Sequence, residues 1–248
     1  MIKKIVLLLC LSFFANAGEI TVALAANVSY AIDELKSEFN KLYPDTKVVV
    51  TLGSSGKLTA QIKSGAPYDL FLSANMAYPN ALYTDGLAVT RPLIYAQGAL
   101  ALFSKEKLDL SKGIMLLEDT SIKKIAIANP ETAPYGKATI QAMEKSEIYK
   151  NVEPKLIYAE SISQVVTFTL LEANIGIIAK SSLYSKEMAA YKEGVNWSDV
   201  DPKLYTPIDQ GIVLLDQAKS NKEAAAFYTF MLSAKAKEIL LKYGYIVP

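Results

Sequence analysis

One stretch constrains the fold of this chain more than any other: an apolar segment meets an amphipathic segment through a Gly-Ser-Ser-Gly turn at 53–56. The β-branched run at 48–52 is typical of a buried parallel strand. Leu58 and Ile62 follow near helical spacing, which predicts a helix that starts near Lys57. The hydroxyls of the turn therefore lie where the first amides of a helix have no partner, and such a helix start favours an anion.

The same order of strand, turn and helix recurs three more times along the chain. Strands are expected at 20–25, 125–128 and 156–159, and each leads through a polar turn into a helical pattern. In these turns Asn27 is a natural helix N-cap, and Pro134 suits an early helical position. Strands that alternate with helices predict an α/β fold with a mainly parallel sheet. Because ligands in such folds bind at the carboxyl ends of strands, the four turns can converge on one ligand.

The chain has 248 residues, enough for one large or two small globular domains. A second series of strands and helices starts at Ile125, and no low-complexity linker separates it from the first. We therefore expect two α/β lobes joined by strands that cross near 93–98 and return near 207–212. The expected lobes are residues 18–95 with 208–248, and residues 96–207.

Two further expectations concern the later part of the chain. The pattern at 222–241 predicts one long helix that folds back on the first lobe. The stretch at 191–201 is rich in charged and turn residues, which predicts an excursion over the surface.

The first seventeen residues have the pattern of a secretory signal. Lys3 and Lys4 precede an apolar core that is too short to span a bilayer, and Ala-Asn-Ala at 15–17 is a typical cleavage site. We expect residues 1–17 to be a signal peptide that is cleaved after Ala17. The only cysteine, Cys10, lies in this segment, and we expect no lipid there because an apolar stretch follows it.

Composition excludes several classes of function for the mature chain. Removal of the signal leaves 24 lysines and arginines against 25 acidic residues, a net charge of −1, which gives no electrostatic case for nucleic-acid binding. Neither cysteine nor histidine remains, which excludes Cys-His and Ser-His nucleophilic catalysis and the usual zinc sites. Arg91 is the only arginine, so a ligand gripped by arginine would depend on that residue.

The turn at 53–56 also matches known catalytic motifs in part. Thr51 and Leu58 stand where a nucleotide-binding P-loop has glycine and a hydroxyl residue, and Lys57 stands where a nucleophile elbow has glycine. Ser54 and Lys57 do fit the Ser-x-x-Lys spacing of serine acyl-enzymes, but this pattern is short and its companion motifs are missing. An exported serine acyl-enzyme therefore stays open as an alternative.

Taken together, the motifs resemble those of the periplasmic molybdate-binding proteins that serve ABC importers. The resemblance covers nearly the whole mature chain, and its most specific block is Gly-Ala-Pro-x-Asp-Leu-Phe-Leu-Ser-Ala at 65–74. It also rests on the segments 20–27, 53–58, 62–67, 129–136, 159–160, 176–177 and 243–245. The resemblance implies a two-lobed periplasmic binding protein fold of the class II type, with hinge-linked lobes that each contain a mainly parallel sheet.

The resemblance also implies which residues bind the oxyanion. By position they are Asn27, Ser55, Tyr135 and Ile162, with Ala26 and Ala179 as additional amide donors. Ala179 stands where many members of the family have a tyrosine, and Tyr135 stands where those members have a small residue. We therefore expect the Tyr135 hydroxyl to replace the one that Ala179 lacks. The resemblance implies no catalytic residue and no cofactor. The only metal that it implies is the one within the bound oxyanion, which the molybdate-binding residues hold.

The implied function is a periplasmic, non-enzymatic solute-binding protein that captures molybdate or tungstate between its lobes. Its implied partner is the membrane permease of an ABC importer, and we expect a monomer that binds no nucleic acid. Amides at helix starts and hydroxyls can hold a doubly charged anion without counter-charges. The alternatives are a binding protein for another oxyanion such as sulfate, the serine acyl-enzyme, and a sensor that binds the anion only to signal.

Overall fold

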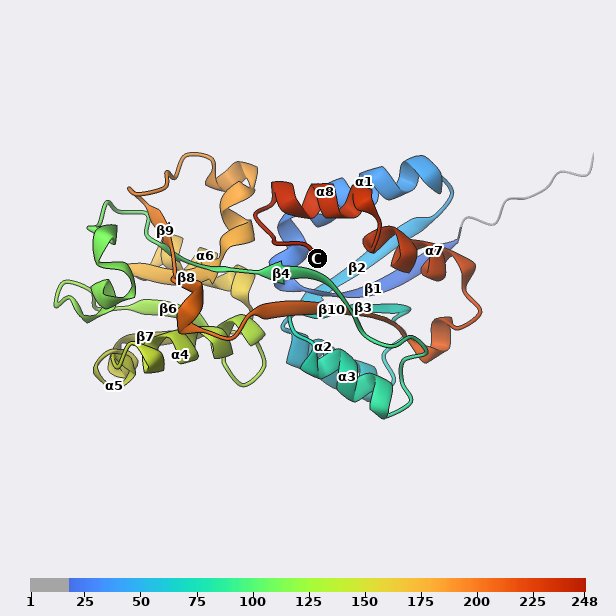
Figure 1. The fold of residues 1–248 in the computed structure, drawn as a ribbon, viewed down its shortest axis with the longest axis horizontal. Helices are drawn as coiled ribbons and strands as arrows, with labels where there is room; N and C mark the ends of the chain where they lie inside the picture. The colour runs from blue at the N-terminus through green and yellow to red at the C-terminus, as the bar shows by residue number, and fades with distance from the viewer. Residues whose placement is uncertain (1–17) are drawn as a thin grey trace, which may run out of the picture.

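The computed structural model describes residues 18–248, which form two α/β lobes lying side by side (Figure 1). The expected signal peptide, with Cys10 and the cleavage site after Ala17, lies outside the described residues. Among residues 18–248, none of the helices is both long and apolar enough to cross a membrane.

The first lobe is built on a five-stranded sheet in the order β2-β1-β3-β10-β4. Strand β1 (Glu19–Ala25) pairs in parallel with β2 (Lys47–Gly53) and with β3 (Leu70–Leu72). Strand β10 (Ile208–Leu214) pairs antiparallel with both β3 and β4 (Leu93–Gly98). Because β1, β2 and β3 run in the same direction, the turns that follow them emerge at one edge of the sheet.

Helices cover both faces of this first sheet (Figure 1). On one face pack α1 (Ile32–Leu42), α7 (Lys222–Met231) and α8 (Ala234–Lys242), and on the other α2 (Ser55–Lys63) and α3 (Ala77–Thr84). Alternate residues of β1 point to opposite faces, as the strand period of two requires.

The two cores of the first lobe follow from that alternation. Val22 and Leu24 belong to the core that includes Phe39 of α1, whereas Ala23 belongs to the core that includes Leu58 of α2. Short 3-10 turns lie at 26–30 (η1) and 216–218 (η7). Helix α1 packs on the sheet through its apolar side, and its charged side faces solvent.

The second lobe repeats the plan with a sheet in the order β7-β6-β8-β5-β9. Strand β6 (Ile125–Ala128) pairs in parallel with β7 (Leu156–Ala159) and β8 (Ile175–Ala179). Strand β5 (Leu100–Phe103) runs antiparallel to both β8 and β9 (Trp197–Asp199). The parallel strands again release their turns at one edge, which in this lobe follows Ala128 and Ala159.

Three helices and several 3-10 turns complete the second lobe. The helices are α4 (Pro134–Lys145), α5 (Tyr149–Val152) and α6 (Ile162–Leu171). The 3-10 turns are η2 at 110–118, η3 at 153–155, η4 at 180–184, η5 at 186–188 and η6 at 202–204. A single core joins β5, β6 and β8 to these helices.

Two chain segments connect the lobes. Strand β4 ends in the first sheet at Gly98 and β5 begins in the second at Leu100, while the chain returns through 205–207 into β10. In Figure 1 both β4 and β10 run from the first lobe toward the second. The expected two-lobed α/β fold is therefore confirmed. The division into 18–95 with 208–248 and 96–207 remains a proposal about which parts move as units.

Two expected elements are wrong in detail. The single helix at 222–241 is two helices, because Ser233 stops α7 and caps α8 by accepting a hydrogen bond from the Ala236 amide at 3.3 Å. The stretch at 191–201 contains β9, which pairs with β5 at the edge of the second sheet and buries Trp197. A three-residue strand is too short for hydrophobic alternation to reveal it.

Candidate functional site

The turns after the parallel strands of both lobes meet at a small cavity. Its wall consists of Ala25, Ala26, Asn27, Gly53, Ser54, Ser55, Ala74, Ala133, Pro134, Tyr135 and Ile162. The first lobe contributes the ends of β1, β2 and β3, and the second contributes the starts of α4 and α6. None of these lining residues is charged, so any attraction for an anion comes from neutral donors.

Three helices begin at the cavity without a side-chain cap. Ser54 precedes α2 and Ser161 precedes α6, yet neither side chain accepts a hydrogen bond from the first turn, and Ala133 before α4 has no group that could. By contrast, Asn221 and Ser233 cap α7 and α8, which lie elsewhere. No capping side chain occupies the first-turn amides at the cavity, although the Gly56 amide of α2 donates to the Thr132 carbonyl, and the positive ends of three helix dipoles favour an anion there.

Ser55 offers the cavity a hydroxyl proton. It is the first residue of α2 and is buried, and its Oγ accepts a hydrogen bond from the Ala74 amide at 2.9 Å. Because a hydroxyl has a single proton and this oxygen already acts as an acceptor, the proton remains available to a ligand. The neighbouring Ser54 Oγ is buried and has no partner among residues 18–248.

Tyr135 has the same arrangement in the second lobe. It is the second residue of α4 and is buried, and its hydroxyl oxygen accepts a hydrogen bond from Gln210 Nε2 at 3.1 Å. A Cβ on Gly98 would lie only 2.0 Å from that oxygen, so only glycine fits beside it. Burial raises the pKa of the Tyr135 hydroxyl well above its ordinary value, so Tyr135 stays protonated and can donate.

The Asn27 side chain hydrogen-bonds to distant residues and does not cap a helix. It lies inside the 3-10 turn η1, whose N-cap is Ala25, so the expectation of a cap at Asn27 is wrong. Its Nδ2 donates to Gln210 Oε1 and to the Tyr245 hydroxyl, both at 2.9 Å. These bonds use both amide protons, which leaves the Asn27 backbone amide as its donor for a ligand. Its Oδ1 is buried without a partner among the described residues.

The remaining expected residues divide into two groups. Ile162 lines the cavity as the first residue of α6, and Ala26 lines it from η1. Ala179 does not reach the wall: it ends β8, where it pairs with Leu100 of β5. The structure thus brings five of the six expected residues to one cavity and leaves Ala179 outside it. Arg91 is exposed and is also absent from the wall.

Two contacts close the lobes over the cavity. The Gly56 amide of α2 donates to the Thr132 carbonyl of the second lobe at 2.8 Å. Next to it, Lys57 Nζ pairs with Glu160 Oε1 at 2.7 Å, and both side chains are about half exposed. Lys57 is therefore engaged by a carboxylate of the opposite lobe. It makes no hydrogen bond to Ser54 in the described chain, which weakens the serine acyl-enzyme alternative.

Three buried polar residues behind the cavity escaped the sequence analysis. The Tyr95 hydroxyl donates to Gln210 Oε1 at 2.8 Å, and the Tyr245 hydroxyl donates to the Asn27 carbonyl at 2.8 Å. Gln210 begins the fully buried part of strand β10, and a polar residue in a buried run is the signal that could have revealed it. Tyr245 falls in the segment 243–245 that carries the resemblance, but no local pattern shows its role or that of Tyr95, because each meets its partner from a distant part of the chain.

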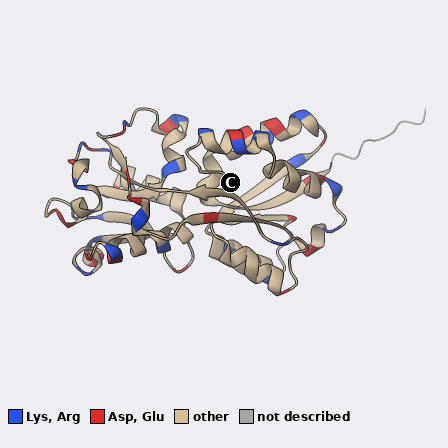
Figure 2. Cartoon of the chain, in the orientation of Figure 1, with Lys and Arg blue, Asp and Glu red and all other residues tan. Residues whose placement is uncertain are grey.

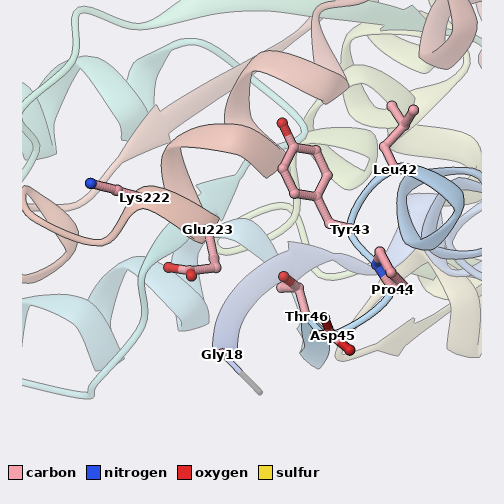
Figure 3. Close-up of a pocket in the computed structure, with 8 residues that line it drawn as sticks. All are labelled: Gly18, Leu42, Tyr43, Pro44, Asp45, Thr46, Lys222 and Glu223. Carbon is pink, nitrogen blue, oxygen red and sulfur yellow. The ribbon is translucent and has the colours of Figure 1, made fainter. Parts of the chain in front are cut away.

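A larger hollow lies away from the carboxyl ends of the strands (Figure 3). It is lined by Gly18, the segment 42–46, Lys222 and Glu223. Gly18 and Thr46 immediately precede β1 and β2, so this hollow is at the edge of the sheet opposite the cavity. The helix that starts there, α7, is capped by its own Asn221. We therefore do not regard this hollow as the functional site.

Charge is spread over the outer helices and loops of both lobes (Figure 2). No group of three or more His, Cys, Asp or Glu side chains within residues 18–248 is placed to hold a metal ion. A site for an anion held by neutral donors is thus the arrangement that stands out in the described part of the chain.

Comparisons with known proteins agree with this geometry. A family model described as bacterial extracellular solute-binding protein matches residues 20–246. The molybdate-binding protein ModA of Rhodobacter capsulatus is 37% identical over 243 residues, which cover 97% of this chain and 93% of the relative. The structure of the Azotobacter vinelandii periplasmic molybdate-binding protein matches with a TM-score of 0.85 at 29% identity, covering 92% of this chain and 99% of that chain.

A further likeness concerns the fold alone. The sulfate-binding protein SubI from Mycobacterium tuberculosis matches with a TM-score of 0.71 at 15% identity, covering 92% of this chain and 86% of that chain. The same two-lobed architecture therefore occurs in a protein named for a different tetrahedral anion.

Proposed function

The chain belongs to the family of bacterial extracellular solute-binding proteins, and on that basis we propose that it captures molybdate or tungstate in the cavity between its lobes. It delivers the anion from the periplasm to the membrane permease of an ABC importer. It acts as a monomer, without a cofactor and without catalysis. Curated relatives named for molybdate binding support this ligand.

The observation that carries the proposal is the set of donors around the cavity. The uncapped N-termini of α2, α4 and α6 form part of the cavity wall, and no residue in that wall is charged. We propose that the anion receives hydrogen bonds from the backbone amides of Asn27, Ser55, Tyr135 and Ile162, with Ala26 in addition. The hydroxyls of Ser55 and Tyr135 supply two further donors.

These donors are sufficient for tight binding on energetic grounds. About six charge-assisted hydrogen bonds at about 1.5–3 kcal/mol each contribute about 9–18 kcal/mol before the cost of association. A micromolar dissociation constant requires only about 8 kcal/mol after that cost, so submicromolar affinity is within reach. Exclusion of bulk water from the closed cavity strengthens each bond further.

Isothermal titration calorimetry with molybdate, tungstate, sulfate and phosphate tests the ligand. We expect submicromolar affinity for molybdate or tungstate and much weaker binding of the other two. Discrimination against sulfate must come from the size of the cavity, because neutral donors meet chemically equivalent oxygens in both anions. Tight binding of sulfate with none of molybdate would instead favour a sulfate-binding protein, which the fold also allows.

A genetic experiment separates transport from sensing. If the protein delivers its ligand to an importer, deletion of its gene lowers molybdenum uptake at trace supply. Uptake that stays normal in the deletion strain, in the absence of a redundant importer, would favour a sensor.

A further inference from the structure

A buried polar cluster connects the cavity to the strands that join the lobes. Its members are Asn27, Tyr95, Tyr135, Gln210 and Tyr245, each at most 3% exposed. Asn27 and Tyr135 line the cavity, whereas Tyr95 and Gln210 lie on β4 and β10. Polar groups buried this deeply are costly unless they are paired, and among residues 18–248 every side-chain polar atom of the cluster except Asn27 Oδ1 has a partner.

Gln210 stands at the centre of the cluster and bonds in a fixed direction. Its Oε1 accepts from Asn27 Nδ2 at 2.9 Å and from the Tyr95 hydroxyl at 2.8 Å. Its Nε2 donates to the Tyr135 hydroxyl oxygen at 3.1 Å. In this arrangement Oε1 receives two donors, and the side chain presents its NH₂ group to Tyr135.

The bond between Gln210 and Tyr135 also crosses between the lobes. Gln210 is on β10 of the first sheet, at the point where the register with β4 shifts, and Tyr135 is on α4 of the second lobe. Movement of α4 away from β10 would separate the two groups. The orientation of the Tyr135 hydroxyl therefore depends on how the lobes are arranged.

We propose that Gln210 is a positioning residue for anion capture. By donating to the Tyr135 oxygen, it forces the Tyr135 proton away from β10 and toward the cavity, and it does so only when the lobes are closed. One of the donors to the anion is thus completed by closure itself. This inference rests on the proposed function and extends it to a residue that does not touch the ligand.

Substitution of Gln210 by glutamate tests the direction of this bond. At pH 8 the introduced carboxylate accepts the Tyr135 proton and turns it away from the cavity, so we expect molybdate affinity to fall about ten- to hundredfold. Burial raises the pKa of such a carboxyl. As the pH is lowered to 5.5 it becomes protonated, donates to Tyr135 as the amide did, and restores the affinity.

The native protein serves as the reference at each pH. The groups that face Gln210 are Tyr95 from β4, Tyr135 from α4 and Tyr245 from the C-terminal segment, and burial raises the pKa of each, so all three stay neutral between pH 5.5 and 8. The adjacent Asp209 accepts a hydrogen bond from Gln97 Nε2 instead.

A double-mutant cycle shows whether Gln210 acts through the Tyr135 hydroxyl. Gln210→Met and Gln210→Glu are each measured by calorimetry with molybdate at pH 8, in the native background and with Tyr135→Phe. We expect Gln210→Met to weaken binding in the native background and to have little effect once the hydroxyl is gone, whereas Gln210→Glu keeps part of its loss because its carboxylate also repels the dianion. Gln97→Met removes an amide from the neighbouring strand β4 that has no contact with Tyr135, and it should leave affinity unchanged.

The outcomes separate this inference from the proposed function. If the native protein does not bind molybdate or tungstate, the proposed function fails and the inference fails with it. If the native protein binds but folded Gln210→Met binds equally well, only the positioning role is wrong. Equal losses for Gln210→Met in the native and Tyr135→Phe backgrounds would also overturn it, as would a low affinity of Gln210→Glu at pH 8 that does not rise at pH 5.5. Thermal melts of each variant establish that it is folded.

Discussion

The Ser55 and Tyr135 hydroxyls come from different lobes but are prepared in the same way. Each oxygen accepts a hydrogen bond from the protein, from the Ala74 amide in one case and from Gln210 in the other. Each proton is therefore free to meet an acceptor in the cavity. This arrangement makes the two side chains donors before the ligand arrives, which lowers the cost of ordering them on binding.

Removal of either hydroxyl should weaken binding. We predict that Tyr135→Phe, which keeps the ring, lowers molybdate affinity by about 1.5–3 kcal/mol, roughly ten- to more than a hundredfold, and that Ser55→Ala behaves alike. Calorimetry measures the loss. Tyr205→Phe is a matched control, because its hydroxyl accepts from the Leu100 amide outside the cavity. Unchanged affinity in Tyr135→Phe would show that the tyrosine contributes only its backbone amide.

The protonation states at the cavity predict how pH acts on the protein. The chain has no histidine, and the cavity wall is uncharged, so we predict constant molybdate affinity from pH 6 to pH 9 by calorimetry. Stability behaves differently at high pH. Burial raises the pKa of Tyr245 from its ordinary 10.0 to about 12, so above pH 10 the unfolded chain loses this proton first.

The sign of the stability change follows from that order. Between pH 10 and 12 the folded state holds more protons than the unfolded state, so the free energy of unfolding should fall as the pH rises. Urea denaturation at pH 8 and pH 11 measures the difference. Equal stability at both values would mean that the buried tyrosines ionise freely in the folded protein.

At the scale of elements, the helix N-termini differ in how they are capped, and α1, α3 and α5 lack a side-chain cap although they begin away from the cavity wall. Helices α7 and α8 are capped by their own side chains, whereas α2, α4 and α6 begin uncapped at the cavity. We predict that Ser233→Ala lowers the free energy of unfolding by about 1 kcal/mol and leaves affinity unchanged. Ser54→Ala, at the equivalent position before α2, should cost the ligand-free protein much less because no capping bond is lost.

Urea denaturation of the two serine variants without ligand checks this contrast. Equal destabilisation by Ser54→Ala and Ser233→Ala would show that Ser54 caps α2 in solution, and the cavity would then offer one donor fewer to the anion.

The sequence predicted the elements that follow simple periodicity, and it predicted the residues that begin helices after parallel strands. Ser55, Tyr135 and Ile162 reach the cavity for that reason, since each follows such a strand closely in the chain. Ser233 shows what was missed: one capping serine divides an apparently continuous helical pattern. Gln210 is a second case, because its partners are separated from it by 75 to 183 residues and no local pattern records those contacts.

At the scale of the whole molecule, the lobes are fastened at the mouth of the cavity by Lys57 and Glu160. Half-exposed ion pairs contribute only about 0–1 kcal/mol to stability. We therefore expect this pair to act mainly on the rate at which the bound ligand dissociates. We predict that Lys57→Met speeds the release of labelled molybdate a few-fold and hardly changes its association rate. Lys63→Met is the matched control, because Lys63 lies on the same helix but pairs with Asp85 within the first lobe. Equal release rates in both variants would exclude a role for the interlobe pair.

The position of Trp197 gives the molecule an optical reporter of its own. It is the only tryptophan in the chain, and Lys180 Nζ lies over its ring at 5.8 Å from the centroid. The next residue, Ser181, donates to the Asn27 carbonyl of the opposite lobe at 2.9 Å. We predict that separation of the lobes, which breaks the bond of Ser181 to Asn27, changes the surroundings of the neighbouring Lys180 and thereby of the indole. The emission of this single fluorophore should therefore change in step with the lobes, which makes closure visible without any attached dye.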